Sequence, residues 1–247
     1  LLAVPAGPLA GRRVVVTAGG TREPIDPVRF IGNRSSGKMG YAVAAEAVRR
    51  GAEVQLVSAP NHLLEPAAVT TTHVETALQM RDAVRKLAAD ADVVVKAAAV
   101  ADFRPASYSP QKIKKDSGDL AAVALEPNPD ILAELGQHGD GPAGMAGPEG
   151  RRRGPFLVGF AAETDLEEER GREKLHRKGA DLIVVNRVDM ADAGFGVDTN
   201  RALLLGRDGE RIEVPLTTKA DLARVLWDVV QARLAEPAGG VSPQRNG

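Results

Sequence analysis

The 247-residue sequence contains no cysteine, few aromatic residues and no excess of charge of either sign. The absence of cysteine excludes disulfides, thiolate metal sites and a cysteine nucleophile, and it fits a reducing cytoplasm. Aromatic residues make up only 3% of the chain, which disfavours base-stacking platforms for single-stranded nucleic acid. Lys and Arg (32) nearly balance Asp and Glu (33), so no overall field favours nucleic acid or an anionic membrane. We therefore expect no nucleic-acid partner.

Long hydrophobic runs are also absent. No apolar stretch approaches the roughly 18 consecutive residues that a membrane-spanning helix needs, and no signal peptide is visible. We therefore expect no membrane partner and a cytoplasmic location. The first residue is Leu1 rather than Met, and we interpret the sequence as part of a longer polypeptide from which a preceding domain is missing.

What the sequence does contain is an alternation of short β-branched runs with stretches of helical periodicity. The runs predict strands at 13–17, 54–57, 69–74, 93–95, 156–160 and 182–185. Apolar and capping residues predict helices at 37–50, 77–89, 130–135, 166–178 and 217–234. Residues 201–213 are typical of a hairpin that turns at Asp208-Gly209. The alternation predicts an α/β fold, a doubly wound, Rossmann-like and mostly parallel sheet with a β-hairpin extension.

Composition divides the chain into one domain and several less regular segments. Residues 1–11 are rich in Ala, Pro and Gly and predict a linker, and residues 12–235 predict a single domain. Within that domain, residues 136–155 combine many Gly and Pro with three consecutive Arg and predict a flexible surface insertion. Residues 236–247 predict a disordered tail.

The first strand ends in Gly19-Gly20, which resembles the start of a dinucleotide-binding turn. That motif needs spaced glycines that run straight into a helix, whereas here Pro24 and Pro27 intervene and the predicted helix begins only at residue 37. The pattern therefore disfavours a nicotinamide cofactor. An NAD-dependent Rossmann oxidoreductase remains the alternative enzyme class.

Residues 32–39 match the P-loop pattern except at Met39, which replaces the Ser or Thr that ligates magnesium. A standard P-loop is therefore disfavoured. The physics behind the motif still applies, because free amides at a helix start form an anion site in any family. We take Gly19, Ser35 and Ser36 as candidate phosphate contacts.

Polar residues gather in the long loop between the first strand and the first helix, residues 18–36. Long loops in compact domains are usually functional or disordered, and the apolar residues within this one favour order. The alternative is a covering loop whose charges are merely solvated. Small residues at 96–102, lysines at 112–115 and a turn at 128–131 complete a candidate triphosphate site, which Lys174 and Lys178 could reach from one helix face.

Six segments together resemble a known family. They are residues 17–21, 32–40, 97–102, 112–115, 128–131 and 159–164, and they occur here in this order. The sequence resembles bacterial phosphopantothenoylcysteine synthetase, the C-terminal half of the bifunctional coenzyme A biosynthesis protein, over about residues 12–235. One departure is Lys96, where a small or apolar residue is expected, and the 136–155 insertion also looks atypical.

The resemblance implies a two-step ligase reaction. The carboxylate of phosphopantothenate attacks the α-phosphorus of CTP to give an acyl-cytidylate and pyrophosphate, and the amine of L-cysteine then displaces CMP. The resemblance places Lys112 with the nucleotide in the first step, Asn33 with the intermediate in the second, and Arg29 in the active-site loop. It implies CTP contacts at Ala97, Ala98, Asp102, Lys112, Pro129, Asp130, Ile131, Leu132, Phe160, Lys174 and Lys178.

The same chemistry requires a divalent cation, Mg²⁺ or Mn²⁺, and we expect Asp102 to contact it. The resemblance also implies a homodimer and a flavin-dependent decarboxylase domain on the N-terminal side. The predicted hairpin at 201–213 is a candidate dimer interface, although its apolar strand can equally pack on its own sheet. A non-catalytic nucleotide-binding module, or a fragment that is inactive without its partner domain, remains a further alternative.

Overall fold

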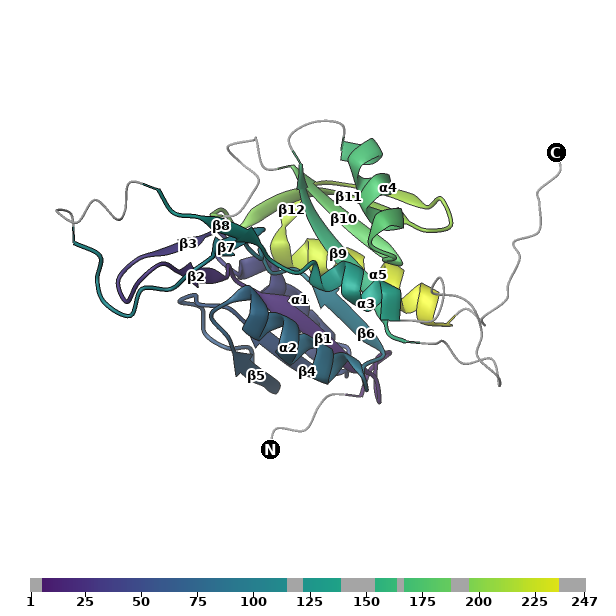
Figure 1. Ribbon diagram of the computed structural model, residues 1–247. Helices are drawn as coiled ribbons and strands as arrows, with labels where there is room; N and C mark the ends of the chain where they lie inside the picture. The colour runs from purple at the N-terminus through teal and green to yellow at the C-terminus, as the bar shows by residue number, and fades with distance from the viewer. Residues whose placement is uncertain (1–5, 115–121, 139–153, 164–166, 188–195, 236–247) are drawn as a thin grey trace.

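The computed structural model describes residues 6–114, 122–138, 154–163, 167–187 and 196–235, and its centre is an eight-stranded sheet (Figure 1). The strands of this sheet are β1 (Arg13–Ala18), β4 (Glu53–Ser58), β5 (Val69–His73), β6 (Val93–Lys96), β9 (Phe156–Glu163), β10 (Leu182–Arg187), β11 (Thr199–Gly206) and β12 (Arg211–Thr218). The helices are α1 (Lys38–Arg49), α2 (Ala77–Ala88), α3 (Ile131–His138), α4 (Glu167–Arg177) and α5 (Lys219–Ala235). The α/β class and its principal elements are therefore as predicted.

The strand order of the sheet is β12-β11-β10-β9-β6-β1-β4-β5. The six strands from β5 to β10 run parallel, and β11 and β12 continue the sheet as an antiparallel hairpin. From β1 the chain moves outward to β4 and β5, and then returns to β6 on the other side of β1 before moving to β9 and β10. The order therefore reverses between β1 and β6, and ligands of open α/β sheets bind outside the carboxyl ends of strands at such a switch point.

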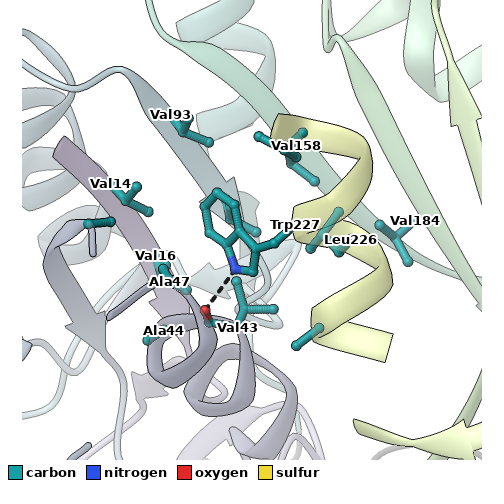
Figure 2. Close-up of a cluster of buried hydrophobic side chains, with 14 of the residues drawn as sticks. Val14, Val16, Val43, Ala44, Ala47, Val93, Val158, Val184, Leu226 and Trp227 are labelled. Atoms are coloured by element: carbon teal, nitrogen blue, oxygen red, sulfur yellow. Dashed lines mark hydrogen bonds between the residues drawn. The ribbon is translucent and has the colours of Figure 1, made fainter. Parts of the chain in front are cut away.

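Helices cover both faces of the sheet. Residues of α1 and α5 pack with one set of strand side chains, and residues of α2, α3 and α4 pack with the other. Figure 2 shows the centre of the first layer, where Trp227 of α5 lies among the valines of β1, β6 and β9. The Trp227 indole N–H donates a 3.0 Å hydrogen bond to the carbonyl of Val43 in α1, so the two helices are joined at the buried ring.

Two short ribbons project together from one side of the domain (Figure 1). One pairs β2 (Arg22–Pro24) with β3 (Phe30–Gly32), and the other pairs β7 (Phe103–Pro105) with β8 (Leu125–Pro127). Strands β2 and β7 contact each other, and the N–H of Ser109 donates to the carbonyl of Ile25. We call residues 22–32, 103–113 and 125–127 the arm. The sequence predicted a long loop at 18–36 and no strand at 103–105 or 125–127, because strands of three residues are too short to show an alternating pattern.

The structure differs from the sequence predictions at three further places. Leu9, within the predicted linker, is buried against the core, and its N–H donates to the carbonyl of Arg50. Helix α3 continues to His138, so the start of the predicted flexible insertion is helical. The hairpin packs on its own sheet with Leu203, Leu204 and Leu205 buried, which removes its apolar strand as a dimer interface. The predicted disordered tail and most of the predicted insertion lie outside the described residues.

Candidate active site

A pocket of about 260 Å³ opens where the sheet reverses its strand order, at the carboxyl ends of β6 and β9 and the start of α1. Its lining residues are Asn33, Ser35, Ser36, Gly37, Lys38, Met39, Gly40, Lys96, Ala97, Ala98, Ala99, Val100, Asp102, Phe160, Ala161, Ala162, Lys174, Lys178, Asn186, Asn200 and Lys219. The volume suits part of a nucleotide-sized ligand and the lining is rich in lysine, so the pocket is suited to an anion.

The start of α1 forms one wall of the pocket. Gly37 precedes the helix with a φ of 80°, and no side chain caps the first turn. A left-handed φ favours glycine, and a Cβ at this position would also lie only 3.3 Å from the backbone nitrogen of Gly19. Residues 37–40 all line the pocket, so the first-turn amides lie at the positive end of the helix dipole beside it.

The segment that continues β6 forms the floor. Its small residues pair with the end of β1: Ala98 donates its N–H to the Thr17 hydroxyl at 3.0 Å, and Ala99 donates to the carbonyl of Gly19 at 2.9 Å. Asn33 is fixed to the same segment, because its side-chain amide donates to the carbonyl of Val100 at 3.2 Å. These hydrogen bonds fix a stretch of backbone with small side chains at the floor of the pocket, where a ligand can approach the backbone closely.

Lys174 of α4 and Lys178, directly after α4, approach the pocket from the opposite face of the sheet. The ammonium of Lys174 pairs with Glu163, a buried carboxylate at the end of β9. Lys178, just after α4, lies 3.3 Å from Asp130 at the start of α3. Burial by itself raises the pKa of Asp130, but the hydrogen bond from Ala133 and the charge of Lys178 hold that pKa below its ordinary value. Both lysines are thus oriented by carboxylates, Lys174 by Glu163 and Lys178 by Asp130.

The far end of the pocket holds two lysines that sequence reasoning missed. Lys38 forms an ion pair of 2.6 Å with Asp198, and the hydrogen bond from Lys38 lowers the pKa of that carboxyl. Lys219 donates to the carbonyl of Val197, and burial followed by the charge of Lys38 lowers its pKa. Lys38 lies within the P-loop look-alike, so its position was a usable signal. Nothing local in the sequence connects Lys219 with this site.

Of the predicted nucleotide contacts, the pocket brings together Ser35, Ser36, Ala97, Ala98, Asp102, Phe160, Lys174 and Lys178. Asn33 also lines it. Asn186, at the end of β10, and Asn200 line it too, and the sequence analysis did not name either residue.

The remaining predicted contacts lie outside the lining. Five predicted contacts do not line the pocket themselves: Gly19, Pro129, Asp130, Ile131 and Leu132. Gly19 lies beside Gly37, and Asp130 contacts Lys178, and both Gly37 and Lys178 line the pocket. The side chains of Ile131 and Leu132 are buried in the second core layer.

The predicted catalytic residues Arg29 and Lys112 lie on the arm and do not line the pocket. Arg29 donates hydrogen bonds to Asp26 and to the carbonyl of Ile113, and Lys112 is exposed beside Ile113. Within one copy of the chain, Asn33 therefore lines the pocket and these two residues do not.

Asp102 is the carboxylate predicted to contact a divalent cation, and it lines the pocket. The described part of the chain contains no group of three or more Asp, Glu, His or Cys side chains placed to hold a metal ion. Magnesium bound with a nucleotide commonly uses one or two carboxylates together with substrate phosphates, so a single carboxylate at this position fits a cation that arrives with the triphosphate.

Residues 9–234 match the family described as the DNA/pantothenate metabolism flavoprotein C-terminal domain. The chain belongs to this family. The coenzyme A biosynthesis bifunctional protein CoaBC of Mycobacterium tuberculosis is 48% identical over 235 residues, which cover 92% of this chain and 54% of that protein. The CoaBC protein of Escherichia coli is 43% identical over 234 residues, covering 94% and 54%.

The fold of this family member is also that of a solved relative. A crystal structure of the C-terminal domain of CoaBC superposes with a TM-score of 0.76 at 42% identity, covering 93% of this chain and 98% of that one. The family predicted from six short segments and the α/β fold predicted from the alternation of strands and helices are therefore confirmed. The chain spans about half the length of the curated relatives it matches. Among the described helices, none combines the length and the apolar character needed to cross a membrane.

Proposed function

We propose that this domain is a phosphopantothenate–cysteine ligase that activates phosphopantothenate with CTP. The observation that supports the proposal most directly is a pocket at the switch point of the sheet that combines Asn33 with Lys174 and Lys178. The same pocket includes the start of α1, which no side chain of the described residues caps. An uncapped helix start and lysines suit a triphosphate, and Asn33 is a neutral group that can orient a substrate without titrating. The names of the relatives place them in coenzyme A biosynthesis, which supports the same choice.

The proposed first step joins the two substrates. A carboxylate oxygen of phosphopantothenate forms a bond to the α-phosphorus of CTP, and the bond from that phosphorus to the departing pyrophosphate breaks. Ser35, Ser36 and the amides of residues 37–40 bind phosphate oxygens, and Lys174 and Lys178 balance the negative charge. Mg²⁺ or Mn²⁺, bound with the triphosphate and contacted by Asp102, would supply further charge neutralisation.

The proposed second step forms the amide. The amine of L-cysteine attacks the acyl carbon, the acyl–oxygen bond breaks, and CMP leaves with the electron pair while the amine loses a proton to solvent. Asn33 donates a hydrogen bond to the reacting acyl group. Its amide nitrogen already donates to Val100, and its second N–H is directed by that contact.

The proposal includes a homodimer, because Arg29 and Lys112 do not reach the pocket of their own copy. The arm that carries them exposes Val28, Phe30, Phe103, Tyr108 and Leu125, whose residues are about half exposed or more. The other large apolar residues exposed in the described part of the chain are Leu64 and Leu216. Such a concentrated apolar surface is typical of an interface. We propose that the arm of one copy covers the pocket of the other and delivers Lys112 to the nucleotide.

Pyrophosphate release tests the function. We expect release to require both phosphopantothenate and CTP, to stop after about one turnover per site without cysteine, and to continue with cysteine. The same assay with ATP in place of CTP measures the nucleotide preference of the enzyme. CTP binding without pyrophosphate release would instead indicate a non-catalytic nucleotide-binding module. Binding of NAD without binding of CTP would indicate the oxidoreductase alternative.

A further inference from the structure

The pocket is lined by five lysines, and oxygens of the protein hold the ammonium groups of four of them. The pairs are Lys38 with Asp198, Lys174 with Glu163, Lys178 with Asp130, and Lys219 with the Val197 carbonyl. The fifth is Lys96. Among the described residues it has no hydrogen-bond acceptor and no ion-pair partner within 4.0 Å.

Lys96 is the last residue of β6, and in the sheet it pairs with Thr17 of β1 and Gly159 of β9. Because side chains alternate along a strand, it lies on the same face as Val94, the face covered by α3 and α4. The charges that act on it come from Lys178 after α4, Asp130 before α3 and Asp102 after β6. Lys96 is half-buried at the pocket wall, directly before the small residues of the floor.

The surroundings of Lys96 disfavour its charge. Burial is the main cause, and the neighbouring ammonium of Lys178 adds to it; together they lower the pKa of Lys96 to about 8, although Asp130 and Asp102 act in the opposite sense. At pH 7 the side chain is therefore still mostly an ammonium. A partly desolvated cation without a direct partner is unfavourable, and a ligand oxyanion in the pocket would relieve that cost.

We propose that Lys96 is a nucleotide-binding residue whose ammonium binds a phosphoryl oxygen of the nucleotide. This inference rests on the proposed ligase function. The nucleotide is the expected partner because Lys96 directly precedes Ala97 and faces Lys178, two residues assigned to the nucleotide. Lys96 is also where the sequence departs from the expected family pattern, so the contact would distinguish this chain from relatives with an apolar residue there.

Direct binding measurements test the proposal with cytidine, CMP, CDP and CTP as ligands. Lys96→Met keeps the length of the side chain and removes its charge, and Lys86→Met removes a lysine from the exposed face of α2 as the matched control. We expect Lys96→Met to weaken CTP binding about ten- to a hundredfold, as for the loss of one charge-assisted hydrogen bond, and to leave cytidine binding unchanged. Lys86→Met should bind all four ligands as the wild type does.

The dependence of binding on pH gives a second readout. Wild-type affinity for CTP should stay constant between pH 7 and the pKa of Lys96 at about 8, and should fall above it as the ammonium loses its proton. Lys96→Met should lack this fall. Lys219, whose pKa is also lowered, is present in both proteins, so the difference between the two profiles belongs to Lys96.

Three outcomes would overturn the inference. Unchanged CTP binding by Lys96→Met, in a wild-type protein that binds CTP and releases pyrophosphate, overturns it and leaves the proposed function standing. Equal weakening of cytidine and CTP overturns it as well, because the effect would then not involve a phosphate. Absence of CTP binding by the wild type overturns the proposed function and this inference together. If circular dichroism shows that Lys96→Met is unfolded, Lys96→Gln serves for the same measurements.

Discussion

The guanidinium of Arg29 donates a 2.7 Å hydrogen bond to the backbone carbonyl of Ile113, which lies far along the chain in the segment of the arm that follows β7. Asp26 completes the connection: its carboxylate accepts hydrogen bonds from Arg29 and, at 3.2 Å, from the N–H of Ile113. Both polar groups of the Ile113 backbone are thus held by the loop between β2 and β3. This clamp sets the position of Lys112, the residue before Ile113, and so links the two residues Arg29 and Lys112 that are proposed to act in catalysis.

The clamp of Asp26, Arg29 and Ile113 predicts that the protein loses folding stability in acid. The hydrogen bond from Arg29 is the largest influence on Asp26 and, against the opposing effect of burial, holds its pKa far below its ordinary value. A depressed folded-state pKa contributes stability that is full above the unfolded value near 3.8 and is lost as pH falls through the folded value. Asp26→Asn should therefore lower the thermal midpoint most above pH 4, with a difference from wild type that shrinks in stronger acid.

Thermal unfolding at a series of pH values between 2 and 7 measures this difference. Asp82→Asn is the control, since Asp82 is an exposed residue of α2 whose only hydrogen bonds in the described structure come from the adjacent Arg81. A constant difference between Asp26→Asn and wild type at every pH would show that the ionised carboxylate does not stabilise the fold.

Exchange of subunits between two inactive variants tests whether Lys112 acts on the partner's pocket. Lys112→Gln should block the first step and Asn33→Asp the second, so each variant alone should show little turnover. In a mixed dimer, one of the two sites combines the intact Asn33 of one copy with the intact Lys112 of the other. Random mixing should restore about a quarter of wild-type activity, because half of the dimers are mixed.

Pyrophosphate release in the presence of cysteine, measured after complete exchange of the two variants, gives the answer. Recovery near zero would place both residues in the site of a single copy and contradict the proposed role of the arm. With Asn33→Asp alone, we expect the acyl-cytidylate to accumulate, which quenched reactions can detect.

The exposed aromatic rings of the arm should control dimerisation. Phe30 and Phe103 are each about half exposed, and the guanidinium of Arg22 lies 4.8 Å from the centre of the Phe30 ring. The double substitution Phe30→Ser with Phe103→Ser removes two apolar anchors, so we expect dissociation at concentrations where the wild type is dimeric. Sedimentation velocity measures the change. Leu64→Ser, at a residue 94% exposed outside the arm, should leave the dimer intact.

The buried ring of Trp227 gives a stability prediction that is independent of the active site. Trp227→Phe removes the hydrogen bond to Val43 and leaves unfilled volume between α5 and the sheet. We expect a loss of about 1–3 kcal/mol in the free energy of unfolding. Urea denaturation followed by circular dichroism measures this loss, and KM values should stay unchanged because Trp227 does not line the pocket. An unaltered urea midpoint would mean that the core refills around the smaller ring.

Local sequence patterns were sufficient to predict the principal strands and helices. The β-branched run of β1 and the threonine that caps α5 carry their signals within a few neighbouring residues, because strand alternation, helical periodicity and capping are short-range effects. The family resemblance likewise depended on short segments. The ribbons of the arm escaped prediction since each strand is three residues long and pairs only with a distant or equally short partner.

The sequence by itself determined the α/β class and the family, and it predicted several of the side chains that line the pocket. Only the tertiary structure decided which of them share it. Lys38 and Lys219 are distant in sequence and line the same pocket because α1 and α5 cover the same face of the sheet. Arg29 and Lys112 lie on the arm, outside the lining that includes Asn33. The sequence also did not reveal that Lys96 has no direct partner among the described residues, since this depends on where Lys178, Asp130 and Asp102 lie around it. Pairing between distant strands and packing between helices set these relationships, and neither is encoded in a local pattern.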